Sequence, residues 1–211
     1  MAQYFEIYPD NPQPRLLKQA VALLQKGGVI ALPTDSSYAL VCQLDDKNAV
    51  ERLRRIRQVN DKHHLTLLCR DLSELANYAL VDNQQYRLMK LGTPGPYTFI
   101  LDATKEVPRR VSRPSRKTIG LRVPDRKGTQ MLLELMGAPL LATTLIPPGE
   151  ELPMNDPEAI RERFEHEIDA IVDAGACPLE STTVIDLTPM RLGNPPVCVR
   201  EGAGPLSAIG L

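Results

Sequence analysis

The sequence has no apolar run long enough to span a membrane. No segment of its 211 residues approaches the roughly 18–20 consecutive apolar residues that a membrane-spanning helix needs. The first stretch, "MAQYFEIYPDNPQPR", also lacks the cationic region and apolar core of a secretory signal. We therefore expect a cytoplasmic protein without a membrane partner.

Cysteine and histidine are scarce. The four cysteines form no C-x-x-C pair, and His63, His64 and His166 show no metal-ligand spacing with them. Structural zinc sites and disulfide frameworks need paired or regularly spaced ligands. We interpret the cysteines as free thiols in a reducing compartment and predict no protein-bound metal.

The chain has no overall excess of positive charge, since its formal net charge is -1. One stretch departs from this average, because residues 105–127 contain nine basic and two acidic side chains. The nine are Lys105, Arg109, Arg110, Arg113, Arg116, Lys117, Arg122, Arg126 and Lys127. An anionic ligand near this stretch and a solvated loop with helix ends are equally good interpretations.

Three common motifs of nucleotide and nucleophile sites are absent. The sequence contains no G-x-x-x-x-G-K-[ST] phosphate loop, no dinucleotide fingerprint and no G-x-S-x-G elbow. The glycines of "GAGPLSAIG" near the C-terminus lack a preceding strand and a following helix. A phosphate ligand would therefore need scattered arginines and hydroxyls at strand ends.

Helical and strand patterns alternate along the chain. Helices are predicted in "NPQPRLLKQAVALLQKGG", after Asp46, in "DLSELANYAL", from Asn83 to Lys90, before Gly137 and in "NDPEAIRERF". Strands are predicted in "VIAL", "LTLLC", "YTFIL", "TIGLRVP", "PLLATT", "AIVDAG", "TTVIDL" and "PVCVRE". The last ten residues are expected to lie irregularly on the surface. Without a linker or repeat, the pattern predicts one α/β domain over residues 1–211, with a twisted, open, mixed sheet and flanking helices.

A cluster of hydroxyl groups follows the strand "VIAL". The stretch is "ALPTDSSYALVC", residues 31–42, and ligands of open α/β sheets bind beyond the carboxyl ends of strands. Thr34 and Ser36 are suited to donate hydrogen bonds to a carboxylate or phosphate, and Tyr38 to stack or donate. A side-chain turn with a helix cap is the alternative, but it explains only part of the cluster.

The sequence resembles the YrdC/YciO family over nearly its whole length. In chain order, the similar stretches are "ALPTDSSYALVC", "AVERLRRIRQ", "PGPYTFIL", "TIGLRVP" and "TTVIDL" followed by "VREG". The stretches "PTDSSYAL", "CRDLSEL" and "TKEVPRR" are most similar to the YciO branch. The resemblance implies a YrdC-like fold with a basic, concave groove.

The resemblance also implies a reaction. Active members of the family make threonylcarbamoyl-AMP from threonine, bicarbonate and ATP, the first step toward threonylcarbamoyladenosine in transfer RNA. The groove would hold ATP or AMP beside threonine, and Mg²⁺ would accompany ATP. The carboxylate of the threonine carbamate attacks the α-phosphorus, which requires positioning and charge stabilisation but no protein nucleophile.

The resemblance assigns binding positions in three pairs. Thr34 and Tyr38 would contact threonine. Arg122 and Arg200 would face the phosphate or base of the nucleotide, and Thr182 and Thr183 would lie beside the bound substrate. Each pair also has an ordinary structural explanation. An arginine can pair with a carboxylate at a strand end, and threonine is a common strand former.

The sequence departs from active relatives after the second helix. Those relatives usually carry a lysine-x-arginine pair there, whereas this chain has "RQVNDKHHL". Arg57 can replace the lysine as a cation, but Val59 cannot replace the arginine. Lys62 and His64 can supply further donors nearby.

A second departure lies in "LLATTLIPPG". Relatives with synthase activity have a serine-x-asparagine motif that contacts the phosphates of ATP. Thr144, beside the predicted binding residue Thr143, keeps the hydroxyl, but Ile146 removes the amide. Charge-assisted contacts contribute about 1.5–3 kcal/mol each, so losing two would slow the reaction about a hundredfold to ten-thousandfold. We expect weakened or altered catalysis, with Arg57 and Thr144 as the remaining catalytic residues.

A non-catalytic module that binds double-stranded RNA or transfer RNA is the alternative hypothesis. The helix "RLRRIR" and the basic stretch of residues 105–127 would contact the RNA backbone. The same arginines, Arg52, Arg54 and Arg55, would equally suit the solvated outer face of a helix.

Overall fold

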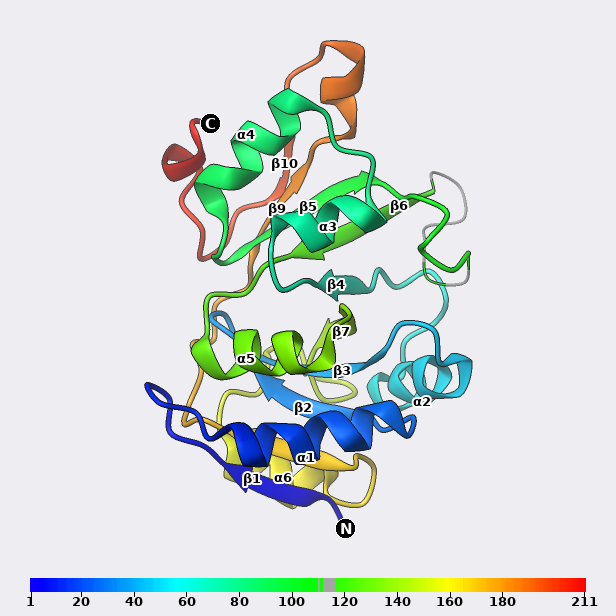
Figure 1. Ribbon diagram of the computed structural model, residues 1–211, viewed down its shortest axis with the longest axis vertical. Coiled ribbons are helices and arrows are strands. Elements are labelled where there is room, and N and C mark those ends of the chain that lie inside the picture. The colour runs from blue at the N-terminus through cyan, green and yellow to red at the C-terminus, as the bar shows by residue number, and fades with distance from the viewer. Residues whose placement is uncertain (110, 112–116) are drawn as a thin grey trace.

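A mixed β-sheet runs through the whole computed structural model, which describes residues 1–109, 111 and 117–211 (Figure 1). Its strands are β1 (Gln3–Glu6), β2 (Ile30–Pro33), β3 (Tyr38–Gln43), β4 (Thr66–Leu68), β5 (Tyr97–Asp102), β6 (Thr118–Arg122), β7 (Leu140–Thr144), β8 (Ala170–Asp173), β9 (Thr183–Asp186) and β10 (Val197–Arg200). The strand order is β1-β8-β2-β3-β7-β4-β6-β5-β9-β10. Four neighbouring pairs are parallel and the others antiparallel. The predicted α/β fold with a mixed sheet is confirmed.

Several helices begin or end at signals that the sequence predicts. They are α1 (Pro14–Gln25), α2 (Lys47–Arg57), α3 (Leu72–Tyr78), α4 (Asn83–Gly92), α5 (Lys127–Met136) and α6 (Pro157–Phe164), with the short 3₁₀ helices η1 (Thr188–Leu192) and η2 (Leu206–Ile209). The carboxylates of Asp46, Asp71 and Asp156 each accept a hydrogen bond from a backbone N–H of the first turn. Gly137, at φ +67°, ends α5 in the left-handed conformation.

The hydroxyl cluster lies in a hairpin that the sequence pattern does not predict. Strand β2 pairs antiparallel with β3, and Pro33 lies opposite Tyr38. Thr34 closes the turn, because its N–H donates to the Ser37 carbonyl at 3.1 Å and its hydroxyl donates to the same oxygen at 2.6 Å. The cluster therefore forms a tight turn, and its hydroxyl residues Thr34, Ser36 and Ser37 are buried.

The two faces of the sheet differ in their cover. One face carries Leu40, Leu67 and Phe99, and packs against apolar residues of α2, α3, α4 and α6. The opposite face carries Ile30 and Leu32, and packs beneath α1 and α5. These two helices contact each other and lie side by side over the half of the sheet that contains β2 (Figure 1).

The register shows where this helical cover stops. Val41 lies opposite Ala142, Ala142 opposite Thr66, Thr66 opposite Gly120 and Gly120 opposite Ile100. Paired residues of adjacent strands share a face, so this row crosses one face from β3 to β5. Val41 and Ala142 belong to the cluster beneath α1 and α5. Thr66, Gly120 and Ile100, further along the row, border the cavity described below.

The prediction of an irregular surface tail was wrong. The Tyr97 hydroxyl donates to the Pro205 carbonyl at 2.9 Å, and Ile209 is 2% exposed within the core cluster. Helix η2 packs against α4 at one end of the sheet (Figure 1). A few long-range contacts thus order a segment that has no helical or strand periodicity.

Within the described part of the chain, no helix is both long and apolar enough to cross a membrane. Arg110, Arg113 and Arg116 of the predicted basic stretch lie outside the described residues.

Candidate functional site

A cavity of about 460 Å³ lies on the sheet face that α1 and α5 leave uncovered. This volume is typical of small-molecule sites. The cavity brings together nine of the eleven residues that the sequence analysis assigns: Thr34, Arg57, Lys62, His64, Arg122, Thr143, Thr144, Thr182 and Arg200. These residues come from four strands or strand ends, one hairpin turn, the last residue of α2 and the segment after that helix.

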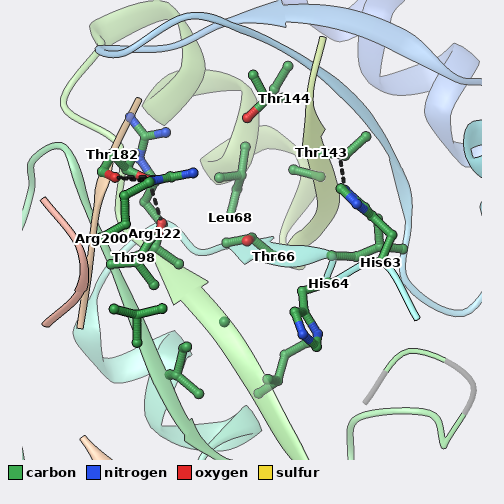
Figure 2. Close-up of a pocket in the computed structure, with 18 of the residues that line it drawn as sticks. His63, His64, Thr66, Leu68, Thr98, Arg122, Thr143, Thr144, Thr182 and Arg200 are labelled. Carbon is green, nitrogen blue, oxygen red and sulfur yellow. Dashed lines mark hydrogen bonds between the residues drawn. The ribbon is translucent and has the colours of Figure 1, made fainter. Parts of the chain in front are cut away.

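The polar groups form two walls with a floor between them (Figure 2). Arg122 and Arg200 lie on one side, close to Thr182, while His63 and His64 lie on the other. Strand β4 crosses the floor, where Thr66 is labelled. Gly120 keeps this floor open, since a Cβ there would lie 3.2 Å from Thr98 Cγ2 and 3.3 Å from Thr66 Oγ1.

Arg122 is the most buried cation of the site, at 6% exposed. Its guanidinium pairs with Asp35 and donates to the Ser36 hydroxyl at 3.0 Å. Its Nε has no hydrogen-bond partner among the described residues. Burial lowers the pKa of Arg122, against the opposing effect of Asp35. The strand-end ion pair considered in the sequence analysis is therefore present, and its arginine also borders the cavity.

Arg57 connects α2 to the segment that follows β7. It ends α2, and its guanidinium donates to the backbone carbonyl of Ile146. Its Nε also has no partner within the described ranges, and burial lowers its pKa. The contact uses the backbone of residue 146, so it does not depend on the side chain that replaces asparagine.

Arg200 lies on the edge strand β10 and is the exposed arginine of the site. Its Nε and one terminal nitrogen donate to the Thr182 carbonyl at 3.1 and 2.9 Å. The Thr182 hydroxyl lies 3.1 Å from the Thr98 hydroxyl (Figure 2). These bonds orient the guanidinium across the end of β9.

Two of the assigned residues, Tyr38 and Thr183, are not among the residues that line the cavity. Tyr38 is 0% exposed, and its hydroxyl donates to the Gly175 carbonyl at 2.9 Å. Thr183 is also fully buried, and its hydroxyl donates to the Gly204 carbonyl at 2.6 Å. Thr182, directly before β9, lines the cavity, whereas Thr183, the first residue of β9, does not.

The sequence analysis missed several lining residues. Thr66, Thr98 and Thr118 place hydroxyls in the cavity, and His63 lines its second wall. Polar residues alternating with Leu67, Phe99 and Ile119 were the available signal, because they indicate one uncovered face. His63 was considered only as a metal ligand.

The described lining residues carry positive charge without a compensating carboxylate. Arg57, Lys62, Arg122 and Arg200 border the cavity, and none of its described lining residues is Asp or Glu. Asp35, which is not a lining residue, neutralises part of this charge through Arg122. Such a cavity favours an anionic ligand.

The described residues contain no cluster of acidic, histidine or cysteine side chains suited to a metal. Mg²⁺ usually binds through one or two carboxylates together with substrate phosphates. The described lining residues include no Asp or Glu, so they do not fit a protein-held Mg²⁺.

Two arginines of the "RLRRIR" helix contact their own chain. Arg52 pairs with Asp169 at 2.6 Å and donates to the Glu167 carbonyl at 2.6 Å. Arg54 is buried and donates to the Asn60 carbonyl at 2.6 Å. Helix α2 therefore presents no continuous basic stripe formed by all three arginines.

Comparison with known proteins agrees with this architecture. Residues 22–202 match the Sua5/YciO/YrdC family model, which carries the description "telomere recombination". The chain is 56% identical to the uncharacterised protein YciO of Escherichia coli strain K12 over 204 residues, covering 97% of each chain. The crystal structure of E. coli YciO matches with a TM-score of 0.93 at 55% identity, covering 99% of this chain and 100% of that one.

More distant relatives have a named activity or ligand. The chain is 30% identical to threonylcarbamoyl-AMP synthase of Halorhodospira halophila over 178 residues, covering 84% of this chain and 92% of that protein. The crystal structure of P. abyssi Sua5 complexed with L-threonine matches with a TM-score of 0.88 at 25% identity, covering 98% of this chain and 59% of that one. The sequence match, the shared sheet and the open cavity together show that the chain belongs to the Sua5/YciO/YrdC family.

Proposed function

We propose that the cavity binds a nucleotide such as ATP or AMP, together with threonine, and that its threonylcarbamoyl-AMP synthase activity is weak or altered. The main support is that Arg57 and Arg122 are both over nine-tenths buried and line one cavity. Charge-assisted hydrogen bonds from arginine to an anion are strong.

The family relation supports this ligand class. A synthase relative and a threonine complex share the fold, and Thr34, Thr144 and Thr182 supply hydroxyls around the cationic groups. A small amino acid and a phosphate chain would both find hydrogen-bond partners in this one cavity.

The proposed reaction needs only positioning and charge stabilisation. A carboxylate oxygen of the threonine carbamate forms a bond to the α-phosphorus, the bond from that phosphorus to the bridging oxygen breaks, and pyrophosphate leaves with the electron pair. Arg57, Lys62 and Arg200 would hold the two anions together and stabilise charge on the leaving group. Mg²⁺ entering with ATP would neutralise further phosphate charge.

Two positions explain the expected weakness. Val59 and Ile146 have apolar side chains where active relatives have an arginine and an asparagine. The guanidinium of Arg57 donates a hydrogen bond to the carbonyl of Ile146. This arginine is therefore partly engaged by the protein itself and less available to the ligand. Binding would then survive better than catalysis.

Calorimetric titration with ATP, with threonine and with both tests binding, and pyrophosphate release dependent on threonine and bicarbonate tests catalysis. We expect measurable binding and slow release by the natural chain. The double variant Val59→Arg with Ile146→Asn should release pyrophosphate at least about tenfold faster, since two charge-assisted contacts are restored. Absence of binding by either ligand, alone or together, would contradict the proposal.

A further inference from the structure

The segment that follows α2 forms one wall of the cavity and is held in place by hydrogen bonds from Arg54 of that helix. Lys62, His63 and His64 line the cavity. Arg54 donates to the carbonyl of Asn60 at 2.6 Å and to that of His63 at 3.4 Å, and the His63 N–H donates to the Asn60 carbonyl at 3.0 Å. The backbone at His63 is therefore held by hydrogen bonds from Arg54 and within the segment.

The His63 ring spans the gap to the neighbouring strand. Its Nε2 lies 3.1 Å from the hydroxyl of Thr143 on β7 (Figure 2). The ring is half-buried, and the hydroxyl can accept from or donate to it. Either a neutral or a protonated ring fits this contact, so a change of protonation does not require the bond to break.

The groups around His63 are mostly cationic. Arg54 and Arg57 face it from α2, Lys62 and His64 adjoin it in the same segment, and β7 contributes only the Thr143 hydroxyl. Asp61 is the acidic neighbour in the segment; its carboxylate is 97% exposed and lies 3.9 Å from Arg54 Nε. Burial, followed by the charges of Arg57, Arg54 and His64, lowers the pKa of His63.

We propose that His63 couples anion binding in this cavity to the uptake of one proton. The inference rests on the proposed function, because it needs a phosphate-bearing ligand beside Arg57. Without the ligand, burial and the neighbouring cations both disfavour the charged ring. A phosphate placed among those cations reverses the local potential and favours the imidazolium, which then contributes a further charge-assisted contact.

This linkage has a defined sign. Binding that takes up a proton becomes tighter as the pH falls, by at most about tenfold per pH unit for one proton. We expect the affinity for ATP to rise about three- to tenfold more between pH 8 and pH 6 in the natural chain than in His63→Gln. Glutamine retains an amide close to the position of Nε2 and can preserve the Thr143 contact, but it does not titrate near neutral pH.

The experiment is titration calorimetry with ATP at pH 6, 7 and 8, repeated at pH 7 in MOPS and in Tris. The dependence of the measured heat on buffer ionisation gives the number of protons taken up. The protons that ATP itself exchanges are common to all variants and cancel in the comparison. His166→Gln is the matched control, because His166 is exposed and lies outside the cavity, and thermal melts check that each variant is folded.

The outcomes separate this inference from the proposed function. Lower proton uptake in His63→Gln, with natural uptake in His166→Gln, supports it. Equal uptake in all three proteins, while ATP still binds, would overturn the inference and leave the proposed function standing. No binding of ATP by the natural chain at any of the three pH values would overturn both.

Discussion

The two halves of one sheet face have the same backbone alternation and different side chains. In the half beneath α1 and α5, the inward positions are Ile30, Leu32 and Val41. In the half that lines the cavity, they include Thr66 and Thr98. Threonine and the β-branched aliphatic residues suit strands equally well. The comparison teaches that the residue types on a continuous face divide it into a part that carries stability and a part that meets a ligand.

The largest effect should come from truncating the covered half. Leu32 is 0% exposed, so Leu32→Ala should lower the free energy of unfolding by about 2–5 kcal/mol, through lost burial and the cavity left behind. Urea denaturation followed by circular dichroism measures this change. Leu32→Ala protein that remains folded should bind ATP with the affinity of the natural chain.

The matched variant in the other half is Thr66→Val. It keeps the shape of a β-branched side chain, and we expect the free energy of unfolding to change by less than about 1 kcal/mol. A loss comparable to that of Leu32→Ala would show that the cavity half also carries the stability of the sheet, and the comparison would then break down.

An intermediate effect is expected from Arg200→Ala, and it should appear in binding. Loss of charge-assisted contacts of about 1.5–3 kcal/mol corresponds to roughly ten- to hundredfold weaker ATP binding. Stability should hardly change, because Arg200 is exposed on an edge strand. Calorimetry and thermal melts separate the two effects.

Arg191→Ala provides the control for that loss of charge. Arg191 lies outside the cavity and pairs with Asp102 at 3.1 Å. Weakening of ATP binding to the same extent in both variants would indicate a general effect of net charge rather than a contact in the cavity.

The smallest effect concerns acid stability. The pKa of His63 is lowered in the folded chain, so the unfolded chain binds more protons below the ordinary histidine value of about 6.5. The stability contributed by the neutral ring is present above that pH and is lost as the pH falls through the folded value. Urea denaturation measures the loss in free energy of unfolding between pH 7 and pH 5. This loss should be smaller in His63→Gln than in the natural chain by up to about 1 kcal/mol, since partial exposure screens the charges. A natural chain and variant with identical pH dependence would contradict this expectation.

Much of the fold can be predicted from the sequence, because local signals determine helix ends and strand runs. Asp46, Asp156 and Gly137 begin or end helices as their residue types indicate. Strand β3 is harder to recognise, since the hydroxyl-rich turn separates it from β2 by only a few residues. The order of η2 depends on Tyr97 and α4, contacts that no local pattern contains.

The site is predictable to a lesser extent. Motif resemblance finds Arg57, Arg122 and Arg200, which the structure brings to one cavity. It does not find the protein groups that these arginines contact, such as Asp35 for Arg122 or the Ile146 carbonyl for Arg57. Those partners are brought close by strand pairing and loop return, so they become evident only in three dimensions.

The cavity has walls drawn from both ends of the chain, from the turn at Thr34 to Arg200 on β10. During synthesis, the nascent polypeptide can therefore assemble this receptor only after its final strand has emerged. Once formed, an occupied receptor joins segments that must separate when the molecule unfolds globally. Any tightly bound ligand would consequently raise the melting temperature of the entire sheet.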